Sequence, residues 1–264
     1  MKMLDVQSIA KTYVTKSGSV PALADVSFDV QSNEFICVVG PSGAGKTTLL
    51  KILSGLLAPT SGQILLEGTP VTGPPEQMAL VFQDYSRSLY PWMRVAENIS
   101  FPLKSRVKDR SERDASVAEA IRSVGLEGFE RSYPWQLSGG MQQRVAIARA
   151  LAYRPDILLM DEPFASVDAQ TRSGLEDLVL ELRRRYNMTI LFVTHDIDEA
   201  VYLADRVVIL TNRPTRVHEI LNVPFGPQRD QITTKEQPEF VHMRSHVYAA
   251  ISSMAAPQAQ AAAS

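Results

Sequence analysis

The 264-residue sequence is poor in cysteine, in net charge and in long apolar runs, and each shortage excludes a class of protein. Its one cysteine, Cys37, cannot form an internal disulfide, which indicates a reducing compartment. A net charge of -2, from 27 Lys and Arg against 29 Asp and Glu, gives no basic field for nucleic acid, so we expect no nucleic-acid partner. No apolar run approaches the roughly 18 residues that cross a bilayer, and the first residues lack the apolar stretch of a secretory signal. We therefore expect a cytoplasmic chain that does not itself span a membrane.

The apolar pattern predicts an α/β fold with an antiparallel β portion. Residues 4–30 alternate between apolar and polar, with Gly18 and Pro21 as breaks, which is typical of antiparallel strands. Residues 35–39 are continuously apolar, and a helical pattern over residues 46–54 follows them after a glycine-rich loop. A strand, a loop and a helix in this order begin a parallel sheet.

Further strand ends are expected where short apolar runs stop abruptly at polar residues. Three such runs are Ala79–Phe82 before Gln83, Ile157–Met160 before Asp161, and Ile190–Val193 before Thr194 and His195. Because the carboxyl ends of parallel strands line the ligand crevice of an open α/β sheet, these polar groups predict one site assembled from several strand ends.

The domain organisation follows from what lies between and after these runs. We expect a single domain over residues 1–220, with a helical subdomain inserted at about 86–154. We expect a short C-terminal extension over residues 221–254. The tail over residues 255–264 is predicted to be disordered, because the closing PQAQAAAS is of low complexity. Within this frame the helices are predicted at Ser111–Val124, about Gly140–Ala152 and Pro238–Ser253, with an edge strand at Val217–Val223.

The segment GPSGAGKT, residues 40–47, fits the pattern G-x-x-x-x-G-K-[ST] of a phosphate-binding loop and stands between a predicted strand and a predicted helix. Its glycines let backbone N–H groups wrap phosphates, and the helix start adds a partial positive charge. Lys46 can reach the terminal phosphates, and the Thr47 hydroxyl can bind Mg²⁺. The predicted nucleotide site consists of Gly40, Pro41, Ser42, Gly43, Ala44, Gly45, Lys46, Thr47 and Thr48.

Two further segments carry phosphate chemistry. Asp161 and Glu162 close an apolar strand, so one carboxylate can hold the magnesium shell while the other polarises an attacking water. The segment LSGGMQ places Ser138 at a helix N-cap, with Gly139 and Gly140 opening the helix. The sequence therefore predicts two separate phosphate sites in one chain.

These segments together resemble the ATP-binding subunits of ABC transporters over about residues 4–215. The resemblance rests on GPSGAGKTT, Gln83, LSGGMQQR, LLMDEP, the loop Ala165–Asp168 and His195, in this order and spacing. The stretches LYPWMRVAENI, DEPFASVDAQTR and NRPTRVHEILNVPFGPQRD are similar to the importer group for nitrate, sulfonates and taurine. The fold implied is a P-loop NTPase, in its ABC ATPase form.

The resemblance implies a role for each matching residue. Glu162 would be the general base, His195 would hold the γ-phosphate and the attacking water, and Gln83 would contact both magnesium and water. Asp161 would bind magnesium together with Thr47. In the remaining positions Tyr13 would stack on adenine, Ser138, Gly139 and Gly140 would bind the nucleotide of a second copy, and Asp168 would link the two copies. Purely structural roles for Tyr13, Gln83 and His195 are the alternatives.

The function implied is ATP hydrolysis that energises a bacterial importer of nitrate, sulfonate, taurine or a related solute. The implied cofactors are ATP and Mg²⁺, and the implied partners are transmembrane permease subunits, a second ATPase subunit and, indirectly, an extracytoplasmic solute-binding protein. The chain would then lie at the cytoplasmic face of the plasma membrane, as a peripheral subunit. A soluble ABC ATPase not coupled to transport is the alternative, and a non-catalytic nucleotide-gated module is a third hypothesis.

An aromatic cluster after Gln83 has two interpretations. Trp92, with Tyr85, Leu89, Tyr90 and Met93, belongs either to the core of the helical subdomain or to an exposed apolar groove for a partner helix.

Overall fold

The computed structural model describes residues 2–16, 18–84 and 88–255, and the chain divides into two compact units. The first unit contains residues 1–74 and 192–264, and the second contains residues 75–191. Tyr85 and, apart from Ala255, the predicted disordered tail lie outside the described residues.

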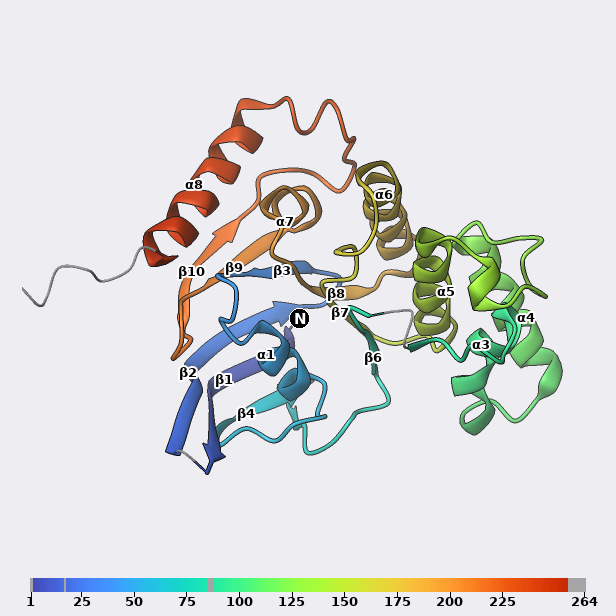
Figure 1. Ribbon diagram of the computed structural model, residues 1–264, viewed down its shortest axis with the longest axis horizontal. Coiled ribbons are helices and arrows are strands. Elements are labelled where there is room, and N and C mark those ends of the chain that lie inside the picture. The colour runs from blue at the N-terminus through green and yellow to red at the C-terminus, as the bar shows by residue number, and fades with distance from the viewer. Residues whose placement is uncertain (1, 17, 85–87, 256–264) are drawn as a thin grey trace, which may run out of the picture. The chain divides into compact units, whose positions relative to one another are not determined.

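The first unit contains an antiparallel sheet with the strand order β2-β1-β4-β5 (Figure 1). Its strands are β1 (Lys2–Thr15), β2 (Gly18–Gln31), β4 (Ser61–Leu66) and β5 (Thr69–Pro70). The prediction that Pro21 breaks the chain is wrong, because Pro21 lies within β2 and pairs with Thr12 of β1. An edge strand of a sheet tolerates proline, since the missing N–H is not required on its open side.

The first unit also carries the strand that leads into the phosphate loop. Strand β3 (Phe35–Val39) is buried at every residue and pairs in parallel with β9 (Arg206–Leu210), which pairs antiparallel with β10 (Val217–Asn222). A continuous apolar run is what a strand covered on both faces requires. Helix α1 (Lys46–Leu53) follows the loop, α7 (Ile197–Leu203) follows strand β8 (Thr189–Val193), and α8 (Pro238–Ala255) is the last described helix.

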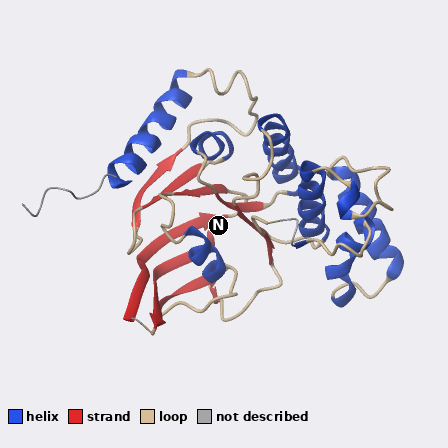
Figure 2. Cartoon of the chain, in the orientation of Figure 1, coloured by secondary structure: helices blue, strands red, loops and turns tan. Residues whose placement is uncertain are grey.

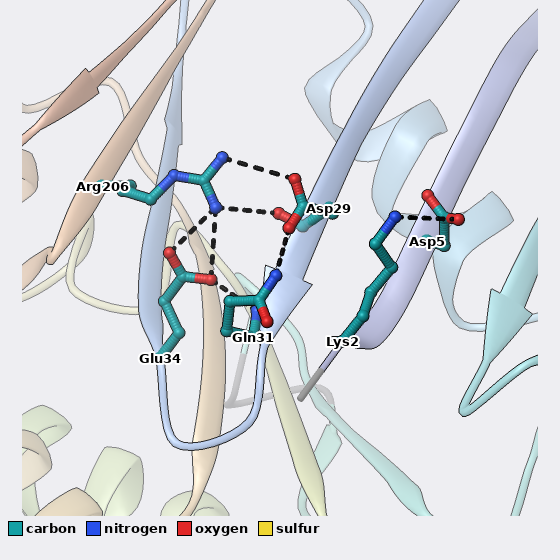
Figure 3. A network of polar contacts seen from close by, with 6 residues as sticks. All are labelled: Lys2, Asp5, Asp29, Gln31, Glu34 and Arg206. Atoms are coloured by element: carbon teal, nitrogen blue, oxygen red, sulfur yellow. Dashed lines mark hydrogen bonds and ion pairs between the residues drawn. The ribbon is translucent and has the colours of Figure 1, made fainter.

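A charged network joins the turn before β3 to the start of β9 (Figure 3). Arg206 donates to both carboxylate oxygens of Glu34, at 3.1 and 3.4 Å, and to the backbone carbonyl of Asp29 at 3.2 Å. The backbone N–H of Gln31 donates to Glu34 as well, at 2.6 Å. Since Glu34 is only 7% exposed, this pairing compensates a nearly buried carboxylate. The network thereby fixes the position of the start of β3. The phosphate loop follows the other end of this strand.

The second unit contains the parallel strands β6 and β7, the first residues of β8, and most of the described helices. Strand β6 (Met78–Val81) pairs in parallel with β7 (Ile157–Asp161). Its helices are α3 (Val95–Ser100), the 3₁₀ turns η1 (Phe101–Ser105) and η2 (Pro134–Gln136), α4 (Arg110–Ser123), α5 (Gly139–Ala152) and α6 (Ala169–Tyr186). Helices α3, α4 and α5 gather into one group (Figure 2). The structure confirms the helices predicted near 111–124 and 140–152.

Side-chain caps explain where the long helices of this unit begin. Asp109, Ser138 and Asp168 each accept a hydrogen bond from a backbone N–H in the first turn of α4, α5 and α6, respectively. Such caps satisfy donors that have no partner within a helix. In the described part of the chain, none of the helices has the length and apolarity that crossing a bilayer requires.

Candidate functional site

The phosphate loop has a backbone that only glycine adopts readily at two positions. Gly43 and Gly45 have φ values of 77° and 85°, and Gly45 is the N-cap residue of α1. At Gly40 a Cβ atom would lie 2.9 Å from the carbonyl oxygen of Leu210 in β9, which is closer than real Cβ contacts. The glycines of the motif are therefore required by this backbone as well as by an approaching phosphate.

Lys46 is the first residue of α1, and its side chain turns back over the loop. Its ammonium group donates to the backbone carbonyls of Gly40 at 2.9 Å and Pro41 at 3.3 Å, and the residue is only 6% exposed. A buried ammonium group needs such partners, because burial without them carries a large desolvation cost. The contacts hold the positive charge of Lys46 at the phosphate loop, as its predicted role requires.

Thr215 is a support of the phosphate loop that the sequence analysis missed. Its hydroxyl donates to the carbonyl of Ala44, and its side chain is fully buried. Its backbone N–H donates to Ala22 at 3.1 Å, and its carbonyl accepts from Ala24 at 2.8 Å. Thr215 thus joins β2 to the loop. It lies in the stretch NRPTRVHEILNVPFGPQRD, but that local pattern does not indicate a contact with Ala44, which is far away in the sequence.

Tyr13 of β1 lies beside the first turn of α1. Its hydroxyl is 3.2 Å from the hydroxyl of Thr48, and the residue is 38% exposed. The ammonium group of Lys11 lies over the Tyr13 ring, 5.7 Å from its centre. A partly exposed aromatic ring next to the phosphate loop can provide a stacking face for a nucleobase.

His195 is exposed on a turn that is held on both sides. The preceding Thr194, only 2% exposed, donates its backbone N–H to Val38 of β3 at 3.2 Å and its hydroxyl to Glu199 at 2.5 Å. The following Asp196 caps α7, accepting from the N–H groups of Asp198 at 2.9 Å and Glu199 at 3.2 Å. The backbone at His195 is therefore fixed to the strand that carries the phosphate loop.

In the second unit, Asp161 is the last residue of β7, Glu162 directly follows it, and Gln83 follows β6. Asp161 is 5% exposed, and the amide of Gln83 donates to the carboxylate of Glu162 at 3.2 Å. Glu162 has a φ of 42°, a left-handed conformation that is strained for a residue other than glycine. Such strain is concentrated at functional sites, and Glu162 is the residue predicted to act as the general base.

The segment at the start of α5 contacts the start of α6 through Thr171. A Cβ atom at Gly140 would lie 2.3 Å from the methyl carbon of Thr171, so the two helices meet only because residue 140 has no side chain. The Thr171 hydroxyl donates to Asp168 at 2.7 Å, and its N–H donates at 3.0 Å. Both bonds lower the pKa of Asp168, and the bond from the hydroxyl has the larger effect.

The N-cap Ser138 accepts a hydrogen bond from the backbone N–H of Met141 at 3.3 Å. This contact does not depend on the type of side chain at position 141.

The second unit also has a mostly apolar groove of about 690 Å³. It is lined by Met78, Ala79, Leu80, Phe82, Asp84, Ser88, Tyr90, Phe101, Pro102, Ala146, Arg149, Ala150 and Tyr153. Arg149 donates to the backbone and hydroxyl oxygens of Ser88, at 2.7 and 2.9 Å, and burial lowers its pKa. Each interpretation of the aromatic cluster holds for some of its residues. Leu89, 2% exposed, belongs to the core, whereas Tyr90 lines the groove and Trp92 is 69% exposed.

The donors predicted for magnesium suit that ion. Mg²⁺ prefers oxygen ligands, and proteins usually bind it with one or two carboxylates together with substrate phosphates and water. Thr47 offers a hydroxyl and Asp161 a carboxylate. Among residues 2–16, 18–84 and 88–255, there is no group of three His, Cys, Asp or Glu side chains that could hold a metal ion.

The predicted site residues are distributed over both units. The first unit contains Tyr13, the loop residues 40–48 and His195, and the second contains Gln83, Ser138, Gly139, Gly140, Asp161, Glu162 and Asp168. The structure brings Tyr13 to Thr48 and Gln83 to Glu162 by direct contacts.

Comparison with known proteins identifies the family. The family model described as ABC transporter matches residues 23–165. A nitrate import ATP-binding protein of Synechocystis sp. is 43% identical over 242 residues, covering 90% of each chain. A taurine import ATP-binding protein of Roseobacter denitrificans is 40% identical over 251 residues, covering 94% of this chain and 93% of its own. A dimeric ATP-binding cassette in a post-hydrolysis state, bound to ADP and phosphate, superposes with a TM-score of 0.74 at 31% identity, covering 85% of this chain and 100% of its own.

Proposed function

This chain belongs to the ABC transporter family and carries its ATP-hydrolysing cassette, and from this premise we propose that it energises an importer of nitrate, sulfonate, taurine or a related small solute. The proposal is supported by the nitrate and taurine import ATP-binding proteins, which match this chain over 90% and 94% of its length. These relatives favour the role of an importer subunit over that of a soluble ABC ATPase. A non-catalytic module is disfavoured because Glu162 and His195 are both present.

The proposed reaction is the transfer of the terminal phosphoryl group of ATP to water. The loop N–H groups and Lys46 bind the phosphates, and Tyr13 stacks on the base. Glu162, held by Gln83, accepts the proton of the attacking water, and His195 contacts the γ-phosphate. Thr47 and Asp161 are the residues that would hold Mg²⁺, which when bound would neutralise charge at the phosphate oxygens.

Two copies are proposed to share each nucleotide, as a homodimer. The start of α5 at Ser138, Gly139 and Gly140 has the geometry of an anion site, because a capped helix start directs N–H groups and a partial positive charge outward. The dimeric ATP-binding cassette that this chain resembles supports this arrangement. Asp168, whose carboxylate stays ionised, would lie at the interface of the two copies.

The groove of the second unit is the proposed contact with a transmembrane permease subunit. Its lining includes the exposed aromatic residues Phe82 and Phe101, which suit an apolar segment of a partner, and Asp84 and Arg149 provide charges within it. Solute selectivity would then reside in the permease and in an extracytoplasmic solute-binding protein. The chain would lie at the cytoplasmic face of the plasma membrane.

The importer proposal is tested by isolating the tagged full chain from gently solubilised membranes of its source, with uptake of the candidate solutes measured in the same cells. A polytopic permease is expected to co-purify. The variant Phe101→Asp, changed within the groove, should no longer co-purify with the permease. The variant Phe129→Asp, at a similarly exposed residue outside the groove, should still co-purify with it. A chain that is absent from membranes yet hydrolyses ATP would contradict the importer and leave the ATPase intact.

A further inference from the structure

Both ends of the short helix α7 are held by arginines from the segment after β10. At its C-terminal end the guanidinium of Arg229 donates to the carbonyls of Tyr202 and Ala204, the latter at 2.8 Å. It also pairs with Asp205 at 3.6 Å, and its side chain is only 1% exposed. The last carbonyls of a helix lack partners within the helix, so a buried guanidinium stabilises this end strongly.

At the N-terminal end of α7 the partner is Arg244 of α8. Its guanidinium pairs with the carboxylate of Asp198 at 3.6 Å. The two side chains are 54% and 48% exposed, so the pair as a whole is open to solvent, but this one oxygen of Asp198 is shielded and accepts no hydrogen bond from the described residues. A shielded carboxylate oxygen is costly unless a charge compensates it, and Arg244 provides that charge. Helix α8 is itself anchored by Phe240 and Val247, which are 2% and 0% exposed.

His195 shares a cleft with this contact. The cleft has a volume of about 670 Å³ and is lined by residues 195–198 on one side and by Arg244, Ser245 and Tyr248 of α8 on the other. Asp198 stands in the first turn of α7, where its N–H donates to the capping carboxylate of Asp196. His195 directly precedes that cap, so a displacement of the first turn displaces His195.

We propose that α8 positions His195 for ATP hydrolysis, through the ion pair of Arg244 with Asp198. The proposal rests on the role of His195 in the proposed function. Arg244 is a positioning residue, because it acts through the first turn of α7. Positioning of reacting groups is worth a measurable part of a rate, since small displacements of a catalytic group lower it. The binding of ATP, which depends on the phosphate loop, should not depend on this pair.

The test compares Mg-ATP turnover and ATP affinity of the full chain in matched variants. Arg244→Ala should lower kcat about two- to fivefold and leave the Kd for ATP within twofold, where fivefold corresponds to about 1 kcal/mol, the upper value for an exposed ion pair. Asp198→Asn should have the same effect, and the double variant should fall no further. Arg244→Lys should recover most of the rate, because a single charge contact is needed. His246→Ala, which breaks the contact of α8 with Glu219 of β10, should keep the wild-type kcat.

Two outcomes would overturn the proposal. One is an unchanged kcat in Arg244→Ala, and the other is an equal loss of kcat in Arg244→Ala and His246→Ala, which would indicate a merely structural role of α8. His195→Ala, measured in parallel, distinguishes this failure from that of the proposed function. If His195→Ala keeps full turnover, the role assigned to His195 is wrong; if it loses turnover while Arg244→Ala does not, only the positioning role fails.

Discussion

The close approach of Gly140 to Thr171 gives a prediction whose sign depends on a single methyl group. In Gly140→Ala the new Cβ would lie 2.3 Å from the Thr171 methyl carbon. Rotating Thr171 away would break its hydroxyl bond to Asp168, so relief of the clash has its own cost. Overpacking of this kind costs about 1–3 kcal/mol, against which alanine gains up to about 1 kcal/mol over glycine in a helix.

The expected net result is a destabilisation of about 1–2 kcal/mol, or about 2–8 °C in Tm. In a Thr171→Ser background the methyl carbon is gone, and the nearest remaining atoms are at 3.7 and 3.9 Å, an ordinary contact distance. There Gly140→Ala should be neutral or slightly stabilising. Gly174→Ala is the matched control, because its Cβ would meet only Arg144, at 3.9 Å, so it should stabilise the chain.

Urea and thermal unfolding of the four variants and the wild type provide the measurement. Equal destabilisation of the Thr171→Ser background and of the wild type by Gly140→Ala would exclude a clash with the Thr171 methyl group. A harmless Gly140→Ala in the wild type would exclude it as well, since the helices would then separate at no cost.

Three further predictions concern the site. Tyr13→Ala should weaken ATP binding about 5- to 100-fold, the range expected for loss of stacking, whereas Tyr13→Phe should bind nearly as the wild type does; equal loss in both would assign the effect to the hydroxyl. Thr215→Val should weaken ATP binding about two- to tenfold through loss of its bond to the phosphate loop, and unchanged binding in the same titration would remove that support role. The lowered pKa of Asp168 means that its stabilising contribution is complete above the ordinary value of about 3.9 and is lost as the pH falls through the lowered value. Asp168→Asn should therefore lose less stability than the wild type between pH 5 and pH 2 in urea unfolding, and parallel losses would exclude this contribution.

Much of the fold could be predicted from the sequence because its signals are local. The buried strand β3 is a continuous apolar run, the loop after it has a fixed glycine and lysine spacing, and α5 begins at a serine cap. Each depends on a few consecutive residues. Pro21 was mistaken for a break because the rule against proline in strands applies to central strands, and the position of β2 at a sheet edge is not visible in its own sequence.

The contacts that could not be predicted join residues far apart in the chain. Thr215 supports Ala44, and Arg229 caps a helix that ended well before it. Both residues lie in the stretch NRPTRVHEILNVPFGPQRD, but its pattern does not indicate their distant partners, since a single threonine or arginine in a loop is usually solvated. The strained φ of Glu162 was hidden for another reason, because the residue type gives no signal of a left-handed backbone.

The central claim, that this chain hydrolyses ATP with Glu162 as the general base, is tested most directly by single-turnover hydrolysis in Glu162→Gln. ATP binding should stay within twofold of the wild type, while hydrolysis should fall about a hundred- to ten-thousand-fold, with Lys46→Ala as the blank. Near-normal turnover in Glu162→Gln would contradict the account.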